Sequence, residues 1–280
     1  MTPPKLVAPP GACDCHMHVY EDRYPLVPQA VFKPPHAPLE DYLVVQKTLG
    51  LSRLVLVQPN GYGFDNRCML EALDKLGESA RAIAIVDPAA TDAELDRLTR
   101  AGVRGIRYHL LPGGMLPLET LENMAARVAG FGWHVQMQLD GRDLAQYENV
   151  LARLPVPLVI DHNGKFLEPV ATDHPGFQTL LRLLDAGNTW VKLSAPYETS
   201  KTGPPHYEDV STLARALVAF APERCVWASN WPHPGRNALP DTATLLDLLL
   251  EWADDDATRH RILVDNPARL YGFYAHSENK

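Results

Sequence analysis

Two histidines, His16 and His18, stand two residues apart near the start of the chain, in the run Asp-Cys-His-Met-His. In an extended strand, side chains two residues apart point to the same face of the sheet, so the two imidazoles converge on one point. Such a pair can hold a metal ion or bind a polarised carbonyl group. The structural alternative is that one histidine is packed in the core and the other is exposed.

Polar side chains also follow the later apolar runs, where predicted strands end. They are Gln58, Arg107, Gln138, Asp161, His162, Lys192, Ser194, Asn230 and His233. In a barrel of parallel strands, catalytic groups come from the carboxyl ends of the strands, so these side chains are expected to gather in one site. The predicted catalytic residues are His16, His18, His162 and Asn230. The predicted substrate contacts are Gln58, Arg107, Gln138, Lys165, Tyr197 and His233.

Each main candidate has a chemical role and a structural alternative. His162 would polarise a carbonyl group or complete a three-histidine site, and otherwise is a packed histidine. Asn230 would hold a substrate through amide hydrogen bonds, or cap a strand end. Arg107 would bind a carboxylate, or pair with an acidic side chain of the protein. Because Asp161 directly precedes His162, strand alternation points Asp161 away from the site and predicts a structural role.

The elements that must position these residues are short apolar strands that alternate with helical segments. The predicted strands are Ala12–His16, Arg53–Gln58, Ala82–Asp87, Gly105–His109, His134–Leu139, Leu158–His162, Trp190–Ser194 and Cys225–Asn230. Eight such units predict a closed (β/α)8 TIM barrel in a single domain. The rival is an open, doubly wound sheet, but no glycine-rich phosphate loop follows the first strand. The proline-rich segment Tyr24 to Pro38 is expected to be a long loop at the active-site end.

Composition limits the classes of protein and partner. The chain has 280 residues, of which 46% are hydrophobic, and this fits one globular domain spanning 1–280 with its core at about 11–273. A net charge of −8 argues against nucleic acid and anionic membranes as partners. No signal peptide and no long apolar run are visible, so a cytoplasmic protein with reduced cysteines is expected. The oligomeric state is left open.

Three strand-end motifs carry a family resemblance. They are Asp-Cys-His-Met-His at the first strand, Val-Ile-Asp-His-Asn-Gly at the sixth and Val-Trp-Ala-Ser-Asn-Trp-Pro-His at the eighth. The chain resembles the amidohydrolase superfamily from about Gly11 to Phe273. More narrowly, it is similar to the lactonase group that includes 2-pyrone-4,6-dicarboxylate lactonase, fuconolactonase and galactarolactone isomerase. This resemblance implies a barrel that acts on the ester bond of a lactone.

Two departures from the lactonases of this group bear on the reaction. Their eighth strand ends in an aspartate that activates water, whereas this chain has Asn230. The pyrone-dicarboxylate enzyme also binds two carboxylates with arginines, and only Arg107 keeps its place. Asparagine at strand eight and several loop segments are more similar to galactarolactone isomerase. That isomerase lacks the first histidine, which this chain keeps as His16.

The resemblance therefore implies isomerisation of a small anionic, sugar-acid type lactone, in which a substrate hydroxyl attacks the carbonyl group. The alternative is hydrolysis, which needs another base such as Asp65, Glu198 or a histidine. A third hypothesis is a catalytically silent lactone-binding barrel. No cofactor is expected to be required, because an amide at position 230 is a poor zinc ligand. If zinc binds at all, His16, His18 and His162 are the expected ligands.

Overall fold

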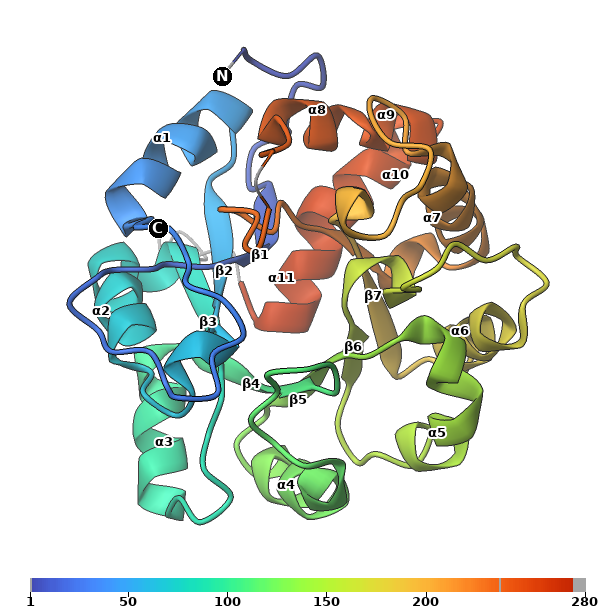
Figure 1. Cartoon of the computed structure of the whole chain (residues 1–280). Coiled ribbons are helices and arrows are strands. Elements are labelled where there is room, and N and C mark those ends of the chain that lie inside the picture. The colour runs from blue at the N-terminus through green and yellow to red at the C-terminus, as the bar shows by residue number, and fades with distance from the viewer. Residues whose placement is uncertain (1, 237, 274–280) are drawn as a thin grey trace, which may run out of the picture.

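The computed structural model describes residues 2–236 and 238–273, and these form a (β/α)8 barrel. The eight strands pair in parallel in the order of the sequence, which confirms the predicted barrel. They are β1 (Cys13–Met17), β2 (Arg53–Val57), β3 (Ala80–Ala84), β4 (Val103–His109), β5 (His134–Gln138), β6 (Leu158–Ile160), β7 (Thr189–Leu193) and β8 (Cys225–Trp227). Figure 1 shows the strands in the middle of the molecule with the helices around them.

Helices follow the strands in turn and cover the outside of the barrel. They are α1 (Leu39–Leu49), α2 (Arg67–Leu76), α3 (Asp92–Ala101), α4 (Leu121–Ala129), α5 (Leu144–Leu151), α6 (Pro175–Asp185), α7 (Glu208–Phe220), α8 (Thr242–Asp247), α9 (Leu249–Trp252), α10 (Asp256–His260) and α11 (Asn266–Tyr271). A π-helical turn, Arg261–Asp265, joins α10 to α11.

The barrel closes between β1 and the residues that follow β8. The backbone N–H of Asn230 donates to the carbonyl oxygen of His16 at 2.8 Å, and the N–H of His18 donates to the carbonyl oxygen of Trp231 at 2.8 Å. These two bonds tie the first and last strand ends together. Closure of the barrel therefore places the His16–His18 pair directly beside Asn230.

The loop that follows β1 forms part of the barrel mouth. Tyr20 and Ala37 exchange two backbone hydrogen bonds of 2.9 and 2.8 Å. The two ends of the intervening loop are therefore held side by side. Within it, residues 30–32 and Pro34 reach the cavity described below. The predicted long loop is therefore present and contributes to the wall of this cavity.

The opposite end of the barrel is filled by aromatic side chains from the C-terminal part of the chain. Tyr271 is fully buried and belongs to an interior cluster with Cys13, Val55 and other inward-facing strand residues. Phe273 lies between the guanidinium groups of Arg53 and Arg81, at 5.4 and 4.7 Å from its ring centroid. The periodicity of the strands could not predict this packing, because Tyr271 and Phe273 lie outside the strands.

Within residues 2–236 and 238–273, no helix combines the length and the apolar character that crossing a bilayer requires.

Replacing Tyr271 by alanine is expected to lower the free energy of unfolding by about 3 to 5 kcal/mol, because it leaves a cavity under the strands. Phe220, on α7 and 48% exposed, is the matched control, and Phe220→Ala should change stability by no more than about 0.5 kcal/mol. Urea unfolding of both variants measures the difference. Equal stability of the two variants would show that Tyr271 does not support the barrel.

Candidate active site

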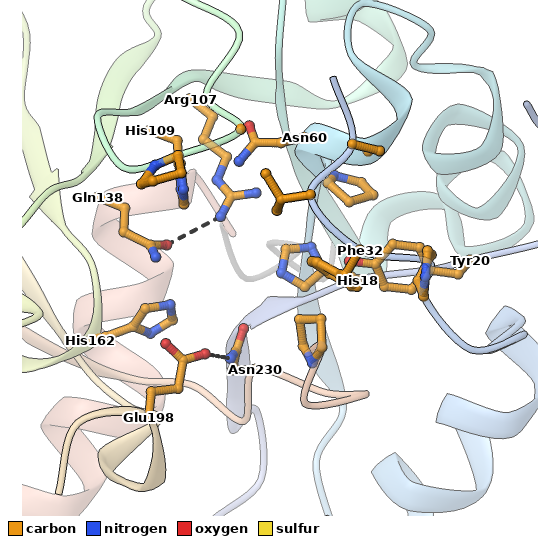
Figure 2. Close-up of a pocket in the computed structure, with 18 residues that line it drawn as sticks. His18, Tyr20, Phe32, Asn60, Arg107, His109, Gln138, His162, Glu198 and Asn230 are labelled. Atoms are coloured by element: carbon orange, nitrogen blue, oxygen red, sulfur yellow. Dashed lines mark hydrogen bonds between the residues drawn. The ribbon is translucent and has the colours of Figure 1, made fainter. Parts of the chain in front are cut away.

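A cavity of about 150 Å³ opens at the carboxyl ends of the strands. Its lining residues are His18, Tyr20, Ala30, Val31, Phe32, Pro34, Pro59, Asn60, Gly61, Arg107, His109, Pro112, Gly113, Gln138, His162, Glu198, Asn230 and Pro234. Figure 2 shows two polar sides, with Arg107, Asn60 and His109 facing His162, Glu198 and Asn230 across the cavity. Five predicted site residues thus line one cavity: His18, Arg107, Gln138, His162 and Asn230.

His16 and His18 are both buried and meet through their ring nitrogens. The two Nε2 atoms are 3.1 Å apart, and His18 Nδ1 lies 2.7 Å from the carbonyl oxygen of Val57. Because a carbonyl oxygen only accepts, Nδ1 of His18 carries a proton. Burial lowers the pKa of His18 to about 3, and burial together with the nearby Lys192 ammonium holds the pKa of His16 well below its usual range. Both rings are therefore neutral near pH 7.

Asp161 and His162 both face the interior, which corrects the predicted outward orientation of Asp161. The side chain of Asp161 is fully buried and accepts a hydrogen bond of 3.1 Å from Gln136 Nε2. Strand alternation fails here because His162 has a left-handed backbone with φ 55°, which turns its side chain back toward the cavity. His162 Nδ1 lies 2.7 Å from Ser194 Oγ, and burial lowers the pKa of His162 well below its usual range.

Beneath the histidines lies a polar cluster inside the barrel. Lys192 on β7 is fully buried, and its Nζ donates to Gln136 Oε1 at 2.6 Å and lies 3.2 Å from His16 Nδ1. The same Nζ is 3.4 Å from Asp161 Oδ1. Burial opposes ionisation of Asp161, but the nearby Lys192 ammonium outweighs it and lowers the pKa of this carboxyl group. The cluster therefore holds a buried ion pair.

Three residues of metal-ligand type lie close together among those that the structure describes. His16, Asp161 and His162 each offer one ligand atom within 4.8 Å of the others, so a carboxylate takes a place that the sequence analysis gave to His18. The group does not suit a resident divalent cation, because the Lys192 ammonium already contacts two of its three members. The side-chain NH₂ of Asn230 is also directed at Tyr197 and Glu198 rather than at this group.

Arg107 is a buried cation at the cavity wall. Its side chain is 5% exposed, donates to the carbonyl oxygen of Gln58 at 2.8 Å and to Gln138 Oε1 at 3.3 Å, and its Nε has no partner. Within the described part of the chain, no carboxylate lies within 4.0 Å of its guanidinium. A buried cation of this kind is strongly stabilised by a bound anion, and a carboxylate matches its planar donors. The cavity therefore has an anion-binding side.

On the opposite side, Asn230 and Glu198 lie together. Asn230 Nδ2 donates to Glu198 Oε1 at 2.9 Å and to the Tyr197 hydroxyl at 2.9 Å. The other carboxylate oxygen of Glu198 pairs with the Lys165 ammonium. Glu198 is thus an oriented carboxylate at the cavity wall, and the sequence analysis named it only as one alternative base.

The remaining predicted substrate contacts lie one layer behind the cavity wall. Lys165 pairs with Glu198, and Tyr197 connects Asn230 to His233, whose Nδ1 is 3.0 Å from the Tyr197 hydroxyl. Gln58 is fully buried and donates to the carbonyl oxygens of Gly63 at 3.2 Å and Asp65 at 2.8 Å. Their observed contacts are with the protein, so direct contact of these four residues with a substrate stays a prediction.

Two polar lining residues, His109 and Asn60, were not among the predicted site residues. His109 lies two positions after Arg107 on the same strand, so alternation alone would have placed both on the same face. Asn60 lies in the turn after β2, where no periodic pattern applies. Burial lowers the pKa of His109 to about 3, so this ring is neutral and presents no competing charge beside Arg107.

Comparisons with known proteins agree with this geometry. Residues 13–273 match the amidohydrolase family, and the curated D-galactarolactone isomerase of Agrobacterium fabrum is 39% identical over 96% of this chain and 94% of its own. This chain belongs to the amidohydrolase family. The 2-pyrone-4,6-dicarboxylate hydrolase of Comamonas testosteroni is 34% identical over 96% of this chain and 92% of its own. An apo crystal structure from Agrobacterium tumefaciens, 39% identical, superposes with a TM-score of 0.90 over 96% of this chain and 98% of its own.

The neutral buried histidines of this amidohydrolase predict acid sensitivity. In the unfolded chain a histidine takes up a proton below about pH 6.5, whereas burial lowers the pKa of His134 on β5 to about 3. The unfolded state therefore binds more protons between these values, and stability falls as the pH is lowered through this range. Each such histidine contributes about 1.4 kcal/mol per pH unit.

His134 lies outside the cavity lining. Its replacement by glutamine should reduce the pH dependence of the free energy of unfolding by the contribution of about one proton. Urea unfolding between pH 7 and pH 4 measures it, and His36→Gln at an exposed position is the control. An unchanged slope in His134→Gln would show that His134 is protonated in the folded protein.

Proposed function

We propose that this amidohydrolase acts on a carboxylated lactone of the sugar-acid type and transfers its acyl group within the molecule, giving an isomeric lactone. The observation that carries the proposal is Arg107, a buried guanidinium without an acidic partner that faces neutral histidines across the cavity. The guanidinium would bind the substrate carboxylate. The lactone carbonyl would then lie on the side of His18 and His162.

The proposed isomerisation conserves all the atoms of the substrate. A substrate hydroxyl attacks the lactone carbonyl carbon, the original ring C–O bond breaks, and the released alkoxide takes the proton that the attacking hydroxyl lost. Neutral imidazoles such as His162 can donate a hydrogen bond to the carbonyl oxygen as negative charge develops on it. Holding both reacting groups in one small cavity supplies much of the rate.

Isomerisation is favoured by the residue at the eighth strand. Asn230 cannot take a proton from water at neutral pH, and its NH₂ group is engaged by Tyr197 and Glu198. The 39% identity to D-galactarolactone isomerase supports the same reaction class. His16, which this chain keeps, lies behind the cavity wall, where its Nε2 is 3.1 Å from Nε2 of His18.

Hydrolysis is the second candidate, and one observation favours it. Glu198 lies at the cavity wall, where it could deprotonate water. Asp65, another base named from the sequence, is instead paired with Arg67 at 2.6 Å and is not among the lining residues. Glu198 contacts the Lys165 ammonium and accepts a hydrogen bond from Asn230 Nδ2, so its carboxylate has a fixed orientation at the cavity wall.

A panel of aldarate and uronate lactones, including D-galactarolactone, tests the proposal. Proton NMR follows each lactone, and base titration detects any acid released. The proposal expects conversion of a carboxylated lactone into its ring isomer without acid release. Release of one acid group per turnover would establish the hydrolase, and binding without turnover would identify a lactone-binding barrel.

Arg107→Met should raise the Michaelis constant for carboxylated lactones by about tenfold to a hundredfold, the value of a hydrogen-bonded charge. Neutral lactones, where they are turned over, should be affected little. Arg67→Met, at an exposed cation outside the cavity, is the control. Equal losses for carboxylated and neutral lactones would show that Arg107 has only a structural role.

We also propose that the reaction requires no metal, since Lys192 already supplies a cation beside His16 and Asp161. Activity should therefore survive dialysis against a strong chelator, even if the purified protein carries some zinc. Turnover before and after chelation, with metal content measured in parallel, is the test. Activity lost on chelation and restored by zinc would contradict the metal-free reaction.

A further inference from the structure

Lys192 is a buried cation that the proposed reaction does not use directly. It lies on β7 with a relative exposure of 0%, and it is not among the residues that line the cavity. Its ammonium reaches Gln136 Oε1 at 2.6 Å, His16 Nδ1 at 3.2 Å and Asp161 Oδ1 at 3.4 Å. A lysine is almost never buried without a compensating charge and hydrogen bonds, so this arrangement needs a reason.

We propose that Lys192 is the fixed cation of the catalytic centre and acts as a positioning residue through His16. It holds His16 in one neutral tautomer, and it occupies the charge position that a divalent cation would need. The inference concerns the protein without substrate, so it does not depend on which lactone is used or on whether the lactone is isomerised or hydrolysed.

The order of protons along the histidine pair follows from its two ends. At the lower end, three groups surround His16 Nδ1: the Lys192 ammonium at 3.2 Å, Gln136 Nε2 at 3.4 Å and Asp161 Oδ1 at 3.4 Å. The Asp161 oxygen makes no hydrogen bond, whereas the other two groups are donors, so Nδ1 offers a lone pair. At the upper end, Val57 accepts at 2.7 Å from His18 Nδ1. The 3.1 Å contact between the rings is then Nε2–H of His16 donating to Nε2 of His18. Lys192 therefore determines which nitrogen of His16 carries the proton.

The amide of Gln136 fixes the same order. Its Nε2 donates to Asp161 Oδ2 at 3.1 Å, and its Oε1 accepts from Lys192. Asp161 Oδ1 accepts no hydrogen bond in this arrangement, although it is buried. Its compensation is therefore the charge of Lys192 at 3.4 Å rather than a hydrogen bond.

Removing the ammonium should convert this cluster into a metal site. A carboxylate oxygen and the Nδ1 lone pair of His16 would both lose their cation, and His162 already lies within 4.8 Å of both residues. Two imidazoles and a carboxylate are a common zinc ligand set. A zinc ion would then be favoured between these ligands, a position from which the Lys192 ammonium now excludes it.

Zinc binding by Lys192→Met tests the exclusion. Isothermal titration with zinc chloride should show one ion per chain, bound at least about tenfold more tightly than by the wild type, with a matching rise in melting temperature. The control Asp161→Asn/Lys192→Met removes the carboxylate as well and should lose this gain. A folded Lys192→Met that binds zinc no better than the wild type would overturn the proposal.

The tautomer is measured on the unmodified protein, so this test does not depend on the variant folding. Histidine labelled with ¹⁵N and long-range proton–nitrogen correlation spectra report which ring nitrogen carries a proton, and His16→Asn assigns the signal. The proposal expects His16 with Nε2 protonated and Nδ1 bare, and His18 with the opposite pattern. A proton on His16 Nδ1 would contradict it, whatever Lys192→Met does.

Discussion

The structure depends on how the barrel balances its buried charges. Among the described residues, three buried cations lie inside the barrel or at its mouth, namely Arg107, Lys165 and Lys192. Lys165 pairs with Glu198. A buried ion without compensation costs several kcal/mol, so each cation needs an anion nearby. Lys192 has Asp161 at 3.4 Å, whereas Arg107 has only a carbonyl and an amide oxygen. A bound substrate carboxylate would compensate the charge of Arg107. Binding of the substrate would therefore also stabilise the folded protein.

The fold brings these charges together through backbone geometry. Barrel closure bonds Asn230 to His16 and Trp231 to His18 through the main chain, so the first and eighth strands share one edge of the cavity. The left-handed conformation at His162 lets Asp161 point into the interior while His162 reaches the cavity. The end of β6 therefore supplies both a cavity-lining histidine, His162, and the carboxylate of the buried ion pair, Asp161.

Period-two patterns predicted much of this arrangement, and its limits have physical causes. The eight strands follow from short apolar runs, and the shared face of His16 and His18 follows from alternation along the first strand; local sequence determines both. The orientation of Asp161 was predicted wrongly, because a positive φ at a non-glycine residue leaves no trace in the hydrophobic pattern. Lys165 was predicted as a substrate contact, but its pairing with Glu198 depends on two loops meeting, which no local pattern encodes.

The central claim is that the acyl group stays within the substrate, since this site has an amide where a water-activating carboxylate would stand. Turnover of D-galactarolactone in water enriched in ¹⁸O tests it most directly, with the product analysed by NMR and mass spectrometry. The account predicts an isomeric lactone of unchanged mass. An open-chain acid that carries one ¹⁸O atom would contradict it and would assign Glu198, or another group at the cavity, as the base that activates water.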